Sequence, residues 1–283
     1  MNALTIAIAL QEAKQQLLSS SDTAELDAEV LLAHALQVAR SYLFAYPERV
    51  LTSDEIIIFQ EYLEQRKIKT PIAYITGHQE FWSLDFIVTS DTLIPRADTE
   101  LLVELVLQFH AADKDKKISI VDLGTGSGAI ALALAHECPH WEVHATDWSV
   151  NALEIAKQNA KRLHLSQVIF HQGSWCKALP SEKKFDVIVS NPPYIASDDP
   201  DLQCGILKYE PASAIISSLN GLQDVLDIIT QAKRYLKPQG KLLIEHGFQQ
   251  GAEIRRIFSN LGYSNINTYQ DLAGLDRVTV GTY

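Results

Sequence analysis

The sequence predicts an α/β fold in which helices cover both faces of a mainly parallel β-sheet, preceded by a small helical region. Two observations carry this prediction. From Lys117 onward, short apolar or β-branched runs alternate with helical patterns, which is typical of βαβ units. Before Pro71, apolar residues recur at helical spacing, and no glycine occurs before Gly77.

The composition narrows the class of protein. The 283 residues include 24 Lys+Arg and 35 Asp+Glu, so the net charge is −11, and 47% of the residues are apolar. These values indicate a globular chain with a sizeable core, and the acidity disfavours non-specific binding to DNA or RNA. No apolar run reaches the ~20 residues of a membrane span. The N-terminus lacks the basic stretch of a secretory signal.

Cysteine usage indicates a reducing compartment. Cys138, Cys176 and Cys204 are odd in number and widely spaced, which predicts neither a disulfide framework nor a thiolate zinc site. We therefore expect a cytoplasmic protein with no metal, no membrane association and no direct nucleic-acid partner.

Three helices are predicted in the N-terminal region. The first follows the helical spacing of apolar residues over 6–17. The second begins after the polar break at 19–22 and ends before Tyr46-Pro47. Thr52 and Glu55 form the pattern of a capping box, which predicts the start of a third helix that Pro71 ends.

A β-hairpin is predicted next, over the aromatic and β-branched residues 81–88. A helix begins at 99–103, and residues 113–117 form a charged turn. The sheet region then contains predicted strands at 118–123, 142–146, 167–171, 185–190 and 241–245, with helices at 129–136, 151–163 and 222–236. The last two strands, 263–269 and 277–281, have no predicted helix between them, which indicates an antiparallel edge.

A glycine-rich loop follows the first parallel strand, where that strand turns into a helix. It comprises Gly124, Thr125, Gly126, Ser127 and Gly128, preceded by Asp-Leu. Glycines allow the backbone to approach a ligand closely. The spacing also satisfies the looser dinucleotide pattern, so the loop alone leaves open a nicotinamide cofactor or S-adenosylmethionine.

Asp147 ends the second strand of the sheet, at the carboxyl edge where ligands of open α/β sheets bind. A carboxylate at this edge can accept both hydroxyls of a ribose, which suits a dinucleotide and a nucleoside-type methyl donor equally. It can also cap the helix that follows.

The motif Asn191-Pro192-Pro193-Tyr194 follows the strand at 185–190 and discriminates best between functions. The two prolines fix two φ angles and remove two N–H groups. The Asn191 carboxamide oxygen and the Pro192 carbonyl then provide two acceptors, and Tyr194 provides a flat ring. This set suits a planar –NH2 group, because holding both N–H bonds directs the nitrogen lone pair at a methyl carbon.

Together the glycine loop and this motif resemble the class I S-adenosylmethionine-dependent methyltransferases that act on a planar amine or amide. Three further segments are similar to the release-factor glutamine methyltransferases, the PrmC/HemK family. They are residues 93–100 (LIPRADTE), residues 27–32 (DAEVLL), and Glu245-His246-Gly247 with residues 276–279 (DRVT).

This resemblance covers nearly the whole chain and implies a seven-stranded mixed sheet with helices on both faces. A β-hairpin would join it to the helical domain. The implied boundaries are 1–72 for a helical bundle that recognises the substrate protein, 73–115 for the hairpin and linker, and 116–283 for the methyltransferase domain. The implied reaction moves a methyl group from S-adenosyl-L-methionine to the side-chain amide nitrogen (N5) of a glutamine. That glutamine belongs to the Gly-Gly-Gln motif of class 1 peptide chain release factors, whose methylation modulates translation termination; the product is S-adenosyl-L-homocysteine.

The resemblance also implies roles for individual residues. The loop 124–128 would hold the methionine part of the donor, Asp147 its ribose and Trp175 its adenine. The glutamine amide would be held by Asn191, Pro192, Pro193 and Tyr194, with Asn191 also next to the donor and Asn191, Pro192 and Tyr194 acting in catalysis. Arg96 and Phe81 would line the substrate channel.

Two positions depart from the family pattern. Ala97 stands where the family usually has proline, which alters the stiffness of that loop. Ser174 stands where an aspartate commonly precedes the tryptophan, so a carboxylate contact to the adenine amino group is missing and donor affinity is expected to be lower.

Three alternatives remain open at the level of the sequence. An adenine-N6 DNA or RNA methyltransferase would use the same pocket for an aromatic –NH2, but the net charge and the helical N-terminus argue against it. An NAD-dependent oxidoreductase would use the glycine loop, but it leaves the Asn191 motif unexplained. The third alternative is a protein that binds the donor without catalysing transfer. The intact Asn191 motif argues against it, and only an activity assay excludes it.

Overall fold

A computed structural model describes residues 4–113, 115–203 and 205–283, which form two compact units. The first contains the described residues up to 77 together with 205–209, and the second contains the described residues of 78–203 and 210–283. The segment 73–115 is therefore divided, because Phe81 and Phe86 of the hairpin are buried in the core of the second unit. Cys138 and Cys176 are buried, whereas Cys204 lies outside the described residues.

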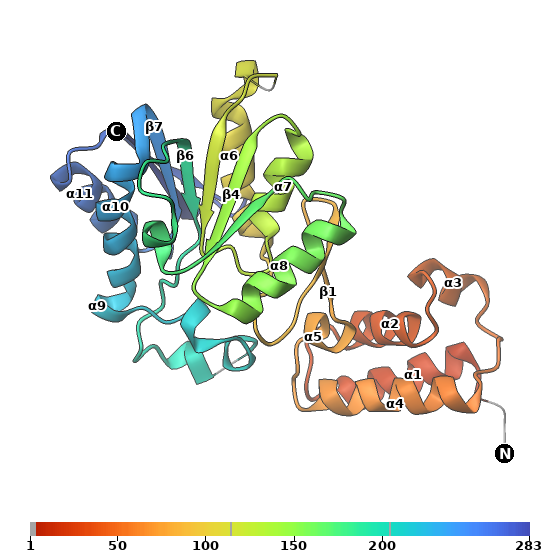
Figure 1. Cartoon of the computed structure of the whole chain (residues 1–283). Helices are drawn as coiled ribbons and strands as arrows, with labels where there is room; N and C mark the ends of the chain where they lie inside the picture. The colour runs from red at the N-terminus through yellow and green to blue at the C-terminus, as the bar shows by residue number, and fades with distance from the viewer. Residues whose placement is uncertain (1–3, 114, 204) are drawn as a thin grey trace. The chain divides into compact units, whose positions relative to one another are not determined.

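The first unit is helical, as the sequence predicts (Figure 1). Its helices are α1 (Ile6–Leu17), α2 (Ala24–Ala35), α3 (Arg40–Ala45), α4 (Ser53–Lys67) and α5 (Ile72–Thr76). The capping box of Thr52 and Glu55 is present at the start of α4. The predicted second helix is two helices, because Gln37 has a φ of 54° that ends the first of them. The short α5 between Pro71 and Gly77 was not predicted.

The second unit contains a two-stranded hairpin, β1 (His78–Phe81) and β2 (Leu84–Ile87), and a seven-stranded sheet. The sheet consists of β3 (Ser119–Leu123), β4 (Glu142–Asp147), β5 (Ile169–Gln172), β6 (Phe185–Ser190), β7 (Leu236–Glu245), β8 (Ser264–Gln270) and β9 (Asp276–Thr282). The spatial order is β5-β4-β3-β6-β7-β9-β8. Strands β3 to β7 pair in parallel and β9 is antiparallel to both neighbours. The predicted mixed sheet with an antiparallel edge is confirmed.

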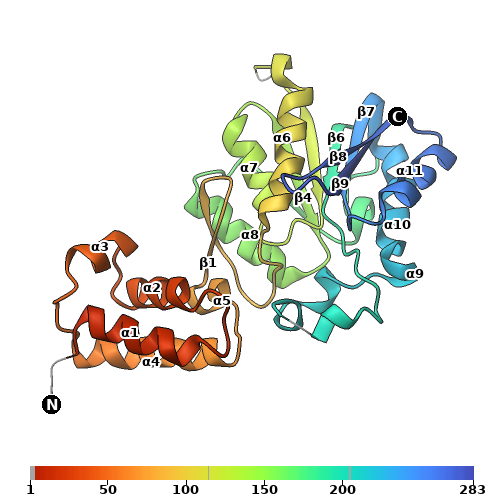
Figure 2. The ribbon, with the colours of Figure 1, turned by 180° about the vertical axis from the view of Figure 1, so that it is seen from behind.

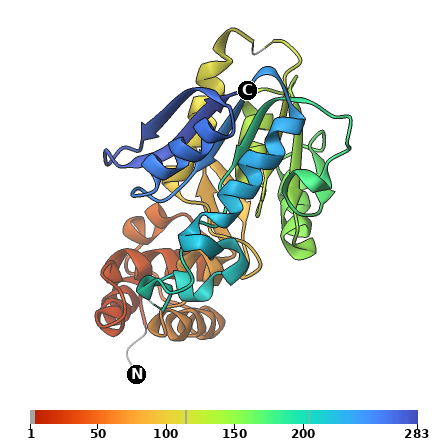
Figure 3. The same cartoon turned by 90° about the vertical axis from the view of Figure 1, so that its left-hand side faces the viewer.

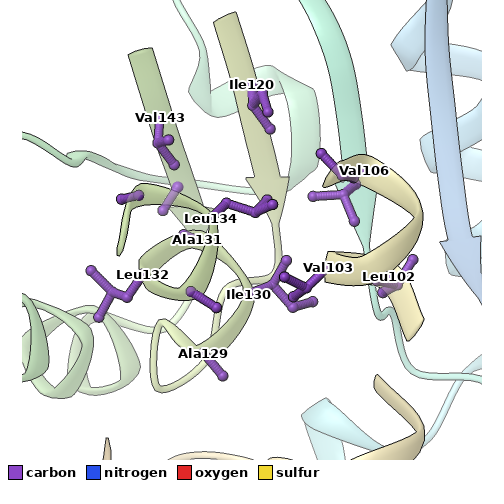
Figure 4. Packing of buried hydrophobic residues seen from close by; sticks show 14 of the residues in the cluster. Leu102, Val103, Val106, Ile120, Ala129, Ile130, Ala131, Leu132, Leu134 and Val143 are labelled. Carbon is purple, nitrogen blue, oxygen red and sulfur yellow. The ribbon is translucent and has the colours of Figure 1, made fainter. Parts of the chain in front are cut away.

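Helices cover both faces of this sheet (Figures 2 and 3). One face packs against α6 (Glu100–Phe109), α7 (Ala129–Glu137) and α8 (Val150–Arg162). The other packs against α10 (Gln223–Tyr235) and α11 (Gly251–Asn260), the side from which Figure 3 views the molecule, and the short α9 (Ser218–Gly221) precedes α10. Figure 4 shows the first core, in which Leu102, Val106, Ile130 and Leu134 of the helices pack over Ile120 of β3.

The strand order reverses between the parallel neighbours β3 and β6. After β3 the chain adds β4 and β5 on one side of the sheet, and after β6 it adds β7 on the other side. The carboxyl ends of strands at such a switch point form a crevice where open α/β sheets bind ligands. The fold thus brings together the loops that follow β3, β4, β5 and β6. Within the described residues, no helix is both long and apolar enough to cross a bilayer.

Candidate active site

A cavity of about 450 Å³ lies at the carboxyl ends of the parallel strands. The loops after β3, β4, β5 and β6 line it, together with residues 91–93 and the segment 211–216. Six of the predicted site residues belong to its lining: Gly124, Gly126, Asp147, Trp175, Asn191 and Pro193. Its volume is within the range of small-molecule sites in proteins.

A neighbouring aromatic ring packs closely against Gly124. Its φ is +74°, and a Cβ built on it would lie 2.9 Å from Cζ3 of Trp175. Both the backbone conformation and the space therefore require glycine. The residue that presents this ring is itself unusual, because Trp175 has a φ of 49°, a strained conformation for a bulky side chain.

Asp122, the fourth residue of β3, supports the rest of the glycine loop through a hydrogen bond to Thr125. The Thr125 hydroxyl donates to its Oδ2 at 2.6 Å, and burial raises the pKa of this carboxyl to about 7. Thr125 and Ser127 are buried, and Gly128 precedes α7 with a φ of +90°. These three predicted residues give the loop its shape without belonging to the cavity lining.

Asp147 is 8% exposed and faces the glycine loop from the end of β4. Its Oδ2 accepts from the Gly126 amide at 2.9 Å and its Oδ1 from the Ser149 amide at 2.9 Å. Burial raises the pKa of the carboxyl. The side-chain cap of α8 is Ser149, which accepts from the Ala152 amide. Each carboxylate oxygen keeps a lone pair for a ligand hydroxyl.

Two further residues of the cavity lining, Ser174 and Trp148, are placed where they could contact the base of a nucleoside. Ser174 lies in the lining beside Trp175, so this wall carries a hydroxyl and no carboxylate at that position. Trp148 also lines the cavity, and its side chain is 62% exposed. Sequence reasoning missed Trp148, although its place directly after the acidic residue at a strand end was a usable signal.

Asn191 lies in the cavity wall after β6, and its Nδ2 donates to Oγ1 of Thr99 at 3.1 Å. Within the described residues, its Oδ1 remains available to accept a hydrogen bond. Pro193 lines the cavity, whereas Pro192 is buried and Tyr194 is half-buried outside the lining. The Tyr194 hydroxyl lies 3.5 Å from Oε1 of Glu245, the last residue of β7.

Arg96 and Phe81 are not among the residues that line this cavity. Arg96 donates through Nη2 to Oε2 of Glu210 at 2.5 Å, and Oε1 of this buried glutamate accepts from the Ile94 amide at 3.0 Å. Phe81 is 1% exposed, and its ring packs edge-on against Phe86 at 6.2 Å. The structure buries Phe81 in the core and pairs Arg96 with Glu210, so a place for these two residues in a substrate channel stays a prediction.

The mixed seven-stranded sheet, with a glycine loop, an acidic residue and Asn191 around one cavity, defines a class I methyltransferase. A family model for a methyltransferase domain matches residues 114–269, and one for the PrmC N-terminal domain matches residues 9–77. A release factor glutamine methyltransferase of Vibrio cholerae is 48% identical over 282 residues, which are 99% of this chain and 98% of that protein. Another, of Aliivibrio fischeri, is 46% identical over the same shares of the two chains.

The protein belongs to the release factor glutamine methyltransferase family, as these matches over the full length show. A solved methyltransferase from Pyrococcus furiosus has a TM-score of 0.52 at 19% identity, and the likeness covers 79% of this chain and 96% of that one. At that identity the likeness shows the fold alone. The expected family and the expected methyltransferase activity are confirmed.

Proposed function

We propose that this protein transfers a methyl group from S-adenosyl-L-methionine to N5 of the glutamine in the Gly-Gly-Gln motif of class 1 peptide chain release factors. The observation that carries the proposal is that one cavity is lined both by the glycine loop with Asp147 and by Asn191 with Pro193. A donor and a planar amide can therefore meet in it. The family supports glutamine as the methylated side chain and a release factor as the partner.

The residues of the donor half suit S-adenosylmethionine. Gly124 leaves room beside Trp175 that a Cβ would fill, and Asp147 offers carboxylate lone pairs for the two ribose hydroxyls. The exposed ring of Trp148 and the ring of Trp175 offer flat apolar faces for an adenine. When bound, this donor supplies a methyl group that is already activated by a sulfonium sulfur.

The chain's own contribution to catalysis is alignment of the acceptor. Because Thr99 engages Nδ2 of Asn191, Oδ1 is the atom that accepts one N–H of the substrate amide. The Pro192 carbonyl would accept the second N–H, and the Tyr194 ring would pack beside the amide. Fixing both N–H bonds orients the nitrogen lone pair toward the methyl carbon, a gain that comes from positioning.

The proposal is tested by methyl transfer from labelled S-adenosylmethionine. The acceptors are purified release factor, the same factor with its Gly-Gly-Gln glutamine changed to alanine, ribosomal RNA and duplex DNA. Label on the intact factor alone is expected. Label on nucleic acid alone would assign the protein to the adenine-N6 class instead. Binding of the donor without label on any acceptor would contradict the proposed substrate.

A further inference from the structure

The segments Glu245-His246-Gly247 and 276–279 have no role in the reaction described so far, and neither belongs to the lining of the cavity. The two segments are joined to each other. The His246 amide donates to the Arg277 carbonyl at 2.9 Å, and Nε2 of the His246 ring lies 2.8 Å from Oγ1 of Thr279. The chain that follows β7 is therefore held on β9.

Gln250 joins this part of the chain to the motif that holds the substrate amide. Its Oε1 accepts from the Gly247 amide at 2.9 Å, and its Nε2 donates to the Tyr194 carbonyl at 3.1 Å. Nε2 also lies 3.4 Å from the Asn220 carbonyl. A backbone amide only donates and a carbonyl only accepts, so these partners fix which end of the carboxamide faces which segment.

Gly247 leaves the space that this side chain occupies. A Cβ built on Gly247 would lie 3.2 Å from Oε1 of Gln250 and 3.7 Å from Cδ2 of Tyr194. The Gln250 amide also donates to the Gly247 carbonyl at 2.9 Å, so the two residues are joined by hydrogen bonds in both directions. The glycine of this motif therefore brings Gln250 close to Tyr194.

The Tyr194 carbonyl is enclosed from a second side by the turn that precedes α10. A Cβ built on Gly221 would lie 2.0 Å from the Tyr194 oxygen. Leu219, Asn220 and Gly221 all have positive φ, at 52°, 55° and 81°. Backbone in this region persists where the surrounding structure determines it, and it is frequent at functional sites. The turn and Gln250 thus meet at the same carbonyl group.

The acceptor motif needs such a contact because its two central residues cannot donate a backbone hydrogen bond. Pro192 and Pro193 have no N–H. On the side of β6, the chain is held by the sheet and by the hydrogen bond of the Asn191 side chain. On the other side, Gln250 holds the Tyr194 carbonyl. The Pro192 carbonyl lies between these two fixed points.

We propose, on the basis of the function proposed above, that Gln250 is a positioning residue for methyl transfer. Through the Tyr194 carbonyl it fixes the Pro192 carbonyl and the Tyr194 ring against the substrate amide. When this hydrogen bond is lost the turn shifts, and a displacement of about 1 Å misdirects the lone pair of the amide nitrogen. The donor-binding loops follow β3, β4 and β5, so donor binding does not depend on this contact.

The test uses two substitutions that break different parts of the link. At pH 8, Gln250→Glu keeps an oxygen for the Gly247 amide but turns a second oxygen toward the Tyr194 carbonyl, and two acceptors repel each other. Gln250→Met keeps the length of the side chain and removes its hydrogen bonds. The measured quantities are kcat and KM for release factor at saturating S-adenosylmethionine, and the Kd of this donor by calorimetry.

We expect both Gln250 variants to lower kcat by at least about tenfold, because the acceptor amide is no longer aligned. The Kd of the donor is expected to change by less than about twofold. Gln249→Glu and Gln249→Met are the matched controls, because they make the same changes at the exposed neighbouring residue. Both controls should keep the kcat and the Kd of wild type. A general loosening of the fold would not lower kcat while leaving the donor Kd unchanged.

Three results would overturn the inference, and they are distinguishable. A wild-type enzyme that does not methylate release factor overturns the proposed function and this inference with it. An active wild type whose Gln250 variants keep its kcat overturns the inference alone. A parallel loss of kcat and donor affinity in the Gln250 variants assigns this residue a structural role instead. If Gln250→Met does not fold, as judged by circular dichroism, the comparison of Gln250→Glu with Gln249→Glu decides the question.

Discussion

Trp148 is an exposed aromatic side chain of the cavity lining, and we expect donor recognition to depend on it. It follows Asp147 directly, lines the cavity, and leaves 62% of its surface in contact with solvent. A large exposed aromatic ring loses the surrounding water only when a flat apolar group covers it. In this site that group is expected to be the adenine of the donor.

We expect Trp148→Ala to weaken the binding of S-adenosylmethionine by about 1–2 kcal/mol, roughly a tenfold rise in Kd, because covering the ring no longer removes apolar surface from water. Calorimetric titration with the donor measures this. Leu272→Ala, at a fully exposed residue in the turn between β8 and β9, is the control and should leave Kd unchanged. An unchanged Kd in Trp148→Ala would place the adenine elsewhere in the cavity.

Single residues of the site were predictable from sequence where their motif is local. The loop 124–128 and Asp147 are recognised by their place at strand ends, and Asn191 by the prolines that follow it. The link from Asn191 to Thr99 joins residues 92 positions apart, so no local pattern indicates it. Phe81 is the converse case, because an aromatic residue in a hairpin has the same local pattern whether it faces a ligand or the core.

At the scale of elements, the hairpin is tied to the glycine loop by one buried side chain. Asn159 of α8 accepts from the Ile87 amide at 2.7 Å and donates to the carbonyls of Ile87 and Ser127, both at 2.9 Å. The side chain is fully buried. Strand β2 and the donor loop are therefore held to the same helix by three hydrogen bonds.

Replacing Asn159 by alanine is expected to lower the free energy of unfolding by about 2–3 kcal/mol, because the Ile87 amide and two carbonyls lose their buried partner. Urea denaturation measures the loss. Gln158→Ala, at the exposed neighbouring position of α8, should change stability by less than about 0.5 kcal/mol. Equal stability of the two variants would mean that the hairpin does not depend on this side chain.

The helices that escaped prediction did so for different reasons. Helix α11 carries Ile254, Ile257 and Phe258 at helical spacing, a usable signal that the prediction from sequence did not include. Helix α5 has five residues between Pro71 and Gly77, and such a short helix is formed by its tertiary contacts. Strands β3, β4 and β6 were predictable because all or all but one of their residues are buried and turn residues bound them.

At the scale of the whole molecule, the division into two units raises the question of what the helical unit contributes. Its described surface carries several large exposed apolar side chains between residues 44 and 57, namely Phe44, Tyr46, Val50 and Ile57, each more than half exposed. A folded release-factor domain must be recognised over an area wider than a cavity for one glutamine side chain. We propose that this helical unit, residues 1–72 in the sequence-based division, binds the substrate protein through such residues.

The double variant Phe44→Ser and Ile57→Ser tests this role without removing a unit. Loss of two apolar anchors is expected to raise the KM for intact release factor by about tenfold. Donor affinity and the methylation of a short Gly-Gly-Gln peptide should stay at wild-type values, because such a peptide is too short to span a second contact surface. Leu18→Ser, at another exposed apolar residue of the helical unit, is the control and should change none of the three. A parallel loss with peptide and intact factor would indicate that the substitutions disturb the catalytic unit, and an unchanged KM for the factor would exclude these residues from its recognition.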